Sequence, residues 1–259
     1  MVNVVRGAAR LSTSVGSGTW IRQYRTAGPG APRLVCFPHA GGSASFYFPV
    51  ATALSPDVDV LAVQYPGRQD RMGEQPLTDL RRLADQVAEA LEPWRDQPLH
   101  LFGHSMGAVI AYEVALRLQQ SPGPGPAALY VSGRRAPSTR RTETVHLRDD
   151  AGLIRELKTL AGTDAALLAD DDVLAMILPA LRADYRAIET YEHRPAPLLT
   201  CPVTALLGDA DPKVTLAEAE VWREHTDEDF DLHVFPGGHF YLTTHQPAVL
   251  TLLRERLKA

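Results

Sequence analysis

The chain has 259 residues, of which 45% are hydrophobic and 22% charged, with a formal net charge of −5 at pH 7. This is an ordinary composition for a globular protein, and the length lies near the upper limit of what a single core organises. The negative net charge and the lack of a basic stripe argue against nucleic-acid binding.

The first 18 residues carry Arg6 and Arg10 among Ser, Gly and Ala, with no acidic residue. A transit peptide has a similar composition, but a disordered leader explains the segment equally well. We expect a leader at residues 1–18 and a single domain at 19–259. No apolar run approaches the roughly 20 residues that span a bilayer, so we expect a soluble, cytoplasmic protein with no membrane association. Cys36 and Cys201 lack metal-ligand spacing, which predicts two buried cysteines, no disulfide and no metal site.

Short apolar runs bounded by turn residues predict strands along most of the chain. Helical patterns lie between several of them; Leu80, Leu83, Val87 and Leu91, for example, share one helix face. This alternation predicts a mostly parallel central sheet flanked by helices. The strands are expected at Arg33–Phe37, Val58–Gln64, Leu99–Phe102, Ala127–Val131, Val203–Leu207 and Phe230–Phe235.

The segment at about 137–197 interrupts the alternation. It shows no convincing strand, but helical patterns occur at Leu153–Leu160 and Val173–Tyr191. Ligands of open α/β sheets bind beyond the carboxyl ends of the strands, where an insertion after the Ala127–Val131 strand would roof the site. The segment is therefore predicted to be a helical lid, or else a packed helical subdomain without a gating role.

A candidate nucleophile lies at Gly103-His104-Ser105-Met106-Gly107, between a predicted strand and the helical stretch Val109–Leu118. The G-x-S-x-G pattern in a strand–turn–helix context is the nucleophile elbow of the α/β-hydrolase fold, in which a tight turn exposes the serine. We therefore predict that Ser105 is a catalytic nucleophile.

A serine hydroxyl needs a base to take its proton, and this fold supplies a histidine late in the chain. His239 fits best because it follows a predicted strand and the turn Pro236–Gly238. The other candidates lie within strands, at the variable elbow position or near the last helix: His100, His104, His233 and His245.

The acid that orients the base should follow the strand Val203–Leu207, where Asp209 and Asp211 compete. Asp211 is preferred because the acid usually lies a few residues beyond the strand, with a proline nearby. Asp209 would then brace the loop by accepting backbone N–H bonds. Asp209 remains the alternative, since sequence cannot measure the geometry of a triad.

An oxyanion hole needs two backbone N–H groups. Met106 follows the nucleophile, and the loop Pro38–Ser43 resembles the HGGG-type loop of esterases, which makes Ala40 the second donor. His39 is expected to buttress this loop through side-chain hydrogen bonds, with a role as a second base as the alternative.

Five motifs are familiar in combination: CFPHAGG at Cys36–Gly42, QYPGR at Gln64–Arg68, FGHSMGA at Phe102–Ala108, GDADP at Gly208–Pro212 and GGHFYL at Gly237–Leu242. Together they resemble the type II thioesterases that accompany polyketide synthases and nonribosomal peptide synthetases. The resemblance runs from about Ala31 to Leu250, and Leu178–Tyr191 is similar to the lid region of that family. Its triad maps onto Ser105, Asp211 and His239, with oxyanion donors at Ala40 and Met106.

The resemblance implies hydrolysis of stalled or aberrant acyl units from the phosphopantetheine arm of an acyl or peptidyl carrier protein. No cofactor is implied, because the pantetheine belongs to the substrate, and a monomer is the default. Carrier proteins are acidic, so local arginines after two strands are candidate docking residues, or else solvated loop residues without a partner: Arg68, Arg71, Arg134, Arg135, Arg140 and Arg141.

Three other functions stay open from the sequence. A carboxylesterase or lipase would share every catalytic residue and differ only in its substrate. A product-releasing cyclase thioesterase is less favoured because no carrier domain precedes residue 19. A ligand-binding protein of the same fold would have no need of a complete triad.

Overall fold

Across residues 19–160 and 170–258, which the computed structural model describes, seven strands form one sheet in the order β1-β3-β2-β4-β5-β6-β7. All neighbouring pairs are parallel except β1 and β3, which are antiparallel. The strands are β1 (Ile21–Gln23), β2 (Arg33–Phe37), β3 (Asp59–Val63), β4 (Leu99–His104), β5 (Pro126–Ser132), β6 (Val203–Gly208) and β7 (Phe230–Phe235).

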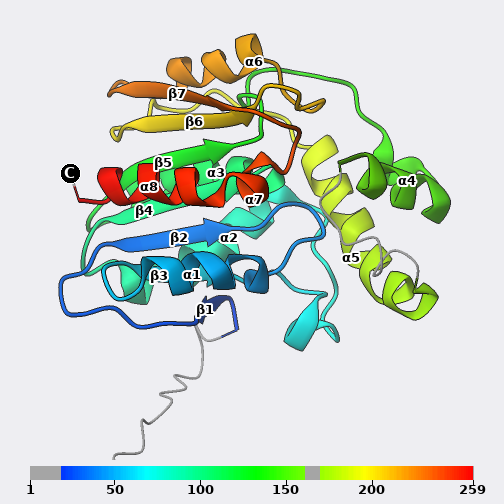
Figure 1. The fold of residues 1–259 in the computed structure, drawn as a ribbon, viewed down its shortest axis with the longest axis horizontal. Helices are drawn as coiled ribbons and strands as arrows, with labels where there is room; N and C mark the ends of the chain where they lie inside the picture. The colour runs from blue at the N-terminus through cyan, green and yellow to red at the C-terminus, as the bar shows by residue number, and fades with distance from the viewer. Residues whose placement is uncertain (1–18, 161–169, 259) are drawn as a thin grey trace, which may run out of the picture.

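Helices cover both faces of the sheet, as the alternation of strands and helices predicts. The helices α1 (Phe48–Leu54) and α8 (Gln246–Arg256) lie on one face, and α2 (Leu80–Leu91) and α3 (Met106–Gln120) lie on the other (Figure 1). Two short helices, α6 (Leu216–Glu220) and α7 (Tyr241–Thr244), follow β6 and β7.

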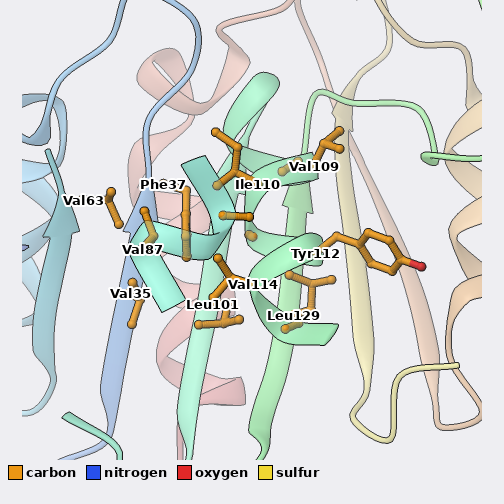
Figure 2. Packing of buried hydrophobic residues seen from close by; sticks show 14 of the residues in the cluster. Val35, Phe37, Val63, Val87, Leu101, Val109, Ile110, Tyr112, Val114 and Leu129 are labelled. Atoms are coloured by element: carbon orange, nitrogen blue, oxygen red, sulfur yellow. The ribbon is translucent and has the colours of Figure 1, made fainter. Parts of the chain in front are cut away.

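Two apolar layers hold these helices against the sheet. Successive side chains of a strand point to opposite faces. In β2, Val35 and Phe37 therefore join the layer under α2 and α3, while Leu34 and Cys36 join the layer under α1 and α8. Figure 2 shows the first layer, in which valine, leucine and isoleucine side chains fill the space between the central strands and α3. Burial on both faces explains why the central strands are nearly continuous apolar runs.

The predicted helical insertion contains α4 (Asp150–Leu160) and α5 (Asp171–Glu189). Both lie beyond the carboxyl ends of the strands, at the right of Figure 1. Within residues 137–160 and 170–197 there is no strand, as expected. Asp170 caps α5, its side chain accepting hydrogen bonds from the N–H groups of Asp172 and Val173.

The fold class predicted from the sequence is confirmed, and every predicted strand is present. The sequence analysis missed β1, a three-residue strand that pairs with the edge of β3. Cys36 and Cys201 are both free and buried, as expected. The predicted leader at residues 1–18 lies outside the described residues. None of the described helices is long and apolar enough to cross a membrane.

Candidate active site

The elbow places Ser105 at a sharp turn between β4 and α3. Its φ of 54° and ψ of −118° lie in a region that non-glycine residues rarely occupy. The turn can be this tight because positions 103 and 107 are glycines, which let other backbone segments pack directly against them. A Cβ at Gly103 would lie 2.2 Å from the Gly107 carbonyl oxygen, and one at Gly107 would lie 2.1 Å from that of Phe37. Only glycine fits at either position, as the motif predicts.

The structure brings Ser105, His239 and Asp211 together. The Ser105 Oγ lies 3.0 Å from the His239 Nε2. The His239 Nδ1 lies 2.8 Å and 3.0 Å from the two Asp211 carboxylate oxygens. His239 and Asp211 are buried, whereas Ser105 is half-buried and faces a cavity. This is the geometry of a nucleophile, a base and an orienting acid.

The other candidate acid, Asp209, makes a different contact. Its Oδ1 accepts a hydrogen bond of 2.8 Å from the Gly237 N–H. The Asp209 N–H in turn donates to the Phe235 carbonyl oxygen. Asp209 therefore ties the loop after β6 to the loop that carries His239, which is the bracing contact expected for it.

Among the described residues, two backbone N–H groups that border the same cavity as the nucleophile have no protein acceptor. Met106 is the first residue of α3, a position whose N–H has no intrahelical partner. In the loop after β2, the Gly41 and Gly42 N–H groups donate to Asp184 and to the His39 carbonyl oxygen, whereas the Ala40 N–H donates to nothing in the described parts of the chain. Ala40, Met106 and Ser105 line the same cavity.

A buried ion pair that the sequence analysis missed fixes this loop. The Asp184 side chain of α5 accepts hydrogen bonds of 2.6 Å and 2.9 Å from the Arg68 guanidinium and one of 2.8 Å from the Gly41 N–H. Arg68 also donates to the Gly42 carbonyl oxygen at 3.0 Å. The helix α5 and the loop after β2 are thus joined through the Asp184 carboxylate. The sequence signals that could have indicated this pair were Arg68 in the QYPGR motif and Asp184 in the lid-like segment Leu178–Tyr191.

His39 supports the loop in a way that differs from the prediction. Its Nδ1 is buried and has no hydrogen-bond partner among the described residues, which corrects the expected buttressing by hydrogen bonds. Its ring instead packs edge-on against Phe46 and Phe240, with centroids 4.8 Å apart in each case. Burial lowers the pKa of His39 to about 3, so it is neutral at physiological pH.

His104, the variable residue of the elbow, is also buried and structural. Its Nδ1 lies 3.0 Å from the Ser132 Oγ, which lies 2.7 Å from the Tyr241 hydroxyl. Burial holds the pKa of His104 well below its usual value. This neutral network supports the β4–β5 side of the elbow.

The two lid helices roof a cavity of about 190 Å³ over Ser105. Its lid side is apolar except for Glu189, and its other walls carry the candidate catalytic residues with Arg134, Glu143 and Lys213. The lid contributes Leu157, Leu160, Val173, Ile177, Leu181, Tyr185 and Ile188. A roofed, largely apolar cavity over a serine is suited to hold an acyl chain.

The structure corrects the docking prediction for three arginines. Arg68 is buried in the ion pair described above. Arg71 is buried, pairs with Glu74 and lies over the Trp20 ring, and Arg135 is buried in an ion pair with Glu143. Arginines that satisfy intramolecular partners do not present an exposed docking surface.

The remaining arginines of that prediction differ from one another. Arg134 is half-buried and lines the cavity, Arg140 is exposed, and Arg141 pairs with Glu218. In the described residues, no cluster of three or more His, Cys, Asp or Glu side chains could hold a metal ion.

The fold and this site define an α/β-hydrolase. The chain belongs to the thioesterase family, because the family model described as "Thioesterase domain" matches residues 32–257. Members of this family are hydrolases that act on thioesters.

Among known proteins, the chain is 53% identical to the "Probable cadicidin biosynthesis thioesterase" of Streptomyces griseus over 92% of this chain and 66% of that protein. It is 52% identical to "Thioesterase PikA5" of Streptomyces venezuelae over 88% of this chain and 82% of that protein. The solved structure of the type II thioesterase BorB from the borrelidin biosynthetic cluster matches with a TM-score of 0.88 and 53% identity, covering 95% of this chain and all of that one. The RedJ thioesterase from the prodiginine pathway of Streptomyces coelicolor matches with a TM-score of 0.83 and 38% identity, over 97% and 91% of the two chains. The resemblance to type II thioesterases seen in the sequence is confirmed.

Proposed function

We propose that this chain hydrolyses acyl thioesters from the phosphopantetheine arm of carrier proteins and so removes stalled or aberrant acyl units from a polyketide or nonribosomal peptide synthase. The observation that carries the proposal is the Ser105–His239–Asp211 geometry under an apolar roof. Similarity to the type II thioesterase BorB from the borrelidin biosynthetic cluster along nearly the whole chain supports the substrate class.

In the first half of the reaction, Ser105 Oγ attacks the thioester carbonyl carbon while His239 Nε2 accepts its proton. Asp211 holds the His239 Nδ1–H and stabilises the imidazolium that forms. The tetrahedral oxyanion accepts hydrogen bonds from the Ala40 and Met106 N–H groups. The C–S bond then breaks, and the pantetheine thiol leaves with the proton from His239. A thiol of pKa about 8.5 is a good leaving group that needs little protonation.

In the second half, a water molecule enters as the thiol departs. His239 takes a proton from this water, which attacks the acyl-serine carbonyl carbon. The C–O bond to Ser105 breaks, Ser105 regains a proton from His239, and the free carboxylic acid is released. No step requires a metal or a redox cofactor, and the pantetheine arm belongs to the substrate.

The test is to compare release of the same acyl group from an acyl carrier protein and from an oxygen ester of matched length. We expect a clear preference for the thioester, with no effect of a metal chelator. Activity confined to oxygen esters would contradict the proposal and favour a carboxylesterase. Binding of acyl carrier protein without turnover would favour a ligand-binding protein.

Asp184→Asn is expected to lower kcat about 10- to 100-fold, because one misplaced oxyanion donor costs up to about 10³-fold and the asparagine retains part of the contact. Asp184 acts through the loop that holds Ala40 and is a positioning residue. The readouts are kcat, KM and the affinity for a trifluoromethyl ketone, which forms an oxyanion on Ser105.

The matched control is Asp150→Asn, which removes the exposed lid ion pair between Asp150 and Arg182. Exposed pairs contribute about 0–1 kcal/mol, so this variant should behave like the unmodified protein. If Asp184→Asn raises KM but leaves kcat and ketone affinity unchanged, Asp184 only holds the lid and the positioning role is wrong.

A further inference from the structure

Among the described residues, two cations line the acyl cavity, Arg134 and Lys213. Arg134 follows β5 and lines this cavity together with the lid side chains. A second cavity of about 280 Å³ adjoins it, and Arg134, Glu143, Ile188 and Glu189 line both. These four residues form the partition between the two cavities. An acyl chain that extends from Ser105 toward this partition therefore approaches a guanidinium.

The Arg134 guanidinium lies close enough to Glu143 and Glu189 for both carboxylates to favour its charge, but neither binds it directly. No hydrogen bond or ion pair reaches it from residues 19–160 or 170–258, and its Nε is buried and unsatisfied. Burial, together with the nearby Arg135, lowers the pKa of Arg134 to about 10, so it stays charged at neutral pH. A buried guanidinium N–H without a hydrogen-bond acceptor is costly.

The neighbouring charged groups already have partners. Glu143 pairs with Arg135 and lies 3.3 Å from the Lys213 Nζ, which also pairs with Glu156 at 2.5 Å. Glu189 accepts hydrogen bonds from the Val145 and His146 N–H groups and from the His146 ring. The two carboxylates of the partition thus have other partners and form no ion pair with Arg134, which leaves its donors available to a ligand in the cavity.

We propose that Arg134 is a specificity-determining residue that binds an oxygen atom of the acyl group, so that the site favours acyl chains bearing a keto, hydroxyl or carboxylate oxygen over plain alkanoyl chains of equal length. This inference rests on the proposed function and names the substrate class of the same site. The apolar lid residues take the methylene groups, and Arg134 takes the oxygen. A hydrogen bond to a charged group with a buried N–H discriminates strongly, because a substrate without the oxygen leaves that N–H unsatisfied.

The test uses four-carbon thioesters that differ only in oxygen content: butyryl, 3-hydroxybutyryl, 3-oxobutyryl and succinyl. Each is prepared on N-acetylcysteamine and on pantetheine. In Arg134→Met, we expect kcat/KM for the oxygenated substrates to fall about 10- to 100-fold relative to butyryl. Arg134→Lys should keep part of the preference. Arg140→Met, at an exposed arginine that lines only the second cavity, is the matched control and should change nothing.

Equal losses on butyryl and on the oxygenated substrates would overturn the inference. A loss of activity seen only with the pantetheine thioesters, whatever their acyl group, would also overturn the inference. Arg134 would then bind an oxygen of the pantetheine arm. The same preference is measured by calorimetry in Ser105→Ala protein, with and without Arg134→Met, so that binding is scored without turnover. Absence of Ser105-dependent hydrolysis of every thioester would instead count against the proposed function.

Discussion

Ser105→Ala is expected to lower kcat for acyl-thioester hydrolysis by about 10⁴- to 10⁶-fold, with little change in KM. The Ser105 Oγ lies 3.0 Å from the His239 Nε2 and forms the covalent bond in the proposed reaction, so its removal would abolish the acyl-enzyme route. The Ala40 and Met106 donors would remain and leave a small residual rate. The measurement is single-turnover release of a labelled acyl group from carrier protein at high enzyme concentration.

The matched control is Ser132→Ala, at the buried serine that contacts His104 and Tyr241 behind the elbow. Ser132 does not touch the reacting atoms, so this variant, which loses two neutral hydrogen bonds behind the elbow, should keep activity within about tenfold. A loss in Ser105→Ala no larger than that in Ser132→Ala would contradict the role of Ser105.

Asp211→Asn is expected to lower kcat by about 10⁴-fold, the effect of the equivalent change in serine proteases. Asp211 receives the His239 Nδ1–H at 2.8 Å and fixes the tautomer in which Nε2 can accept the serine proton. An asparagine can present an N–H to Nδ1 and stabilise the other tautomer. Its oxygen can still accept the Lys213 N–H, which bonds to Asp211 Oδ1 at 2.8 Å, so the loop should stay folded.

Asp209→Asn provides the comparison two residues away. Its amide oxygen can still accept the Gly237 N–H, so we expect less than about a tenfold loss, the scale of one hydrogen bond. Both kcat and the thermal midpoint are measured for the pair. If Asp209→Asn proves the more damaging change to kcat, the assignment of the acid is wrong.

The arrangement of Ser105, His239 and Asp211 could be predicted because it depends on local sequence signals at strand ends. Gly103 and Gly107 permit the turn, and the loops after β6 and β7 meet because those strands are parallel neighbours. Parallel strands bring their carboxyl ends to one edge, so residues after separate strands converge there. The position of Ser105, Asp211 and His239 follows from this rule.

Contacts between elements far apart in sequence were not predictable in the same way. Arg68 and Asp184 are 116 residues apart, and only the packing of α5 against the loop after β3 brings them together. For the same reason the sequence could not show that Arg68, Arg71 and Arg135 are buried. An arginine in a loop has the same local signature whether it binds a buried carboxylate or water. The short strand β1 was missed because three residues give too little periodicity.

The measurement that tests the central claim most directly is covalent labelling of the protein with an alkyl phosphonofluoridate, read by intact mass and peptide mapping alongside thioesterase activity. We predict one adduct per chain, on Ser105, with activity lost in proportion to labelling and with protection by acyl carrier protein substrate. An adduct on another residue, or full labelling of Ser105 with thioester hydrolysis retained, would contradict the account.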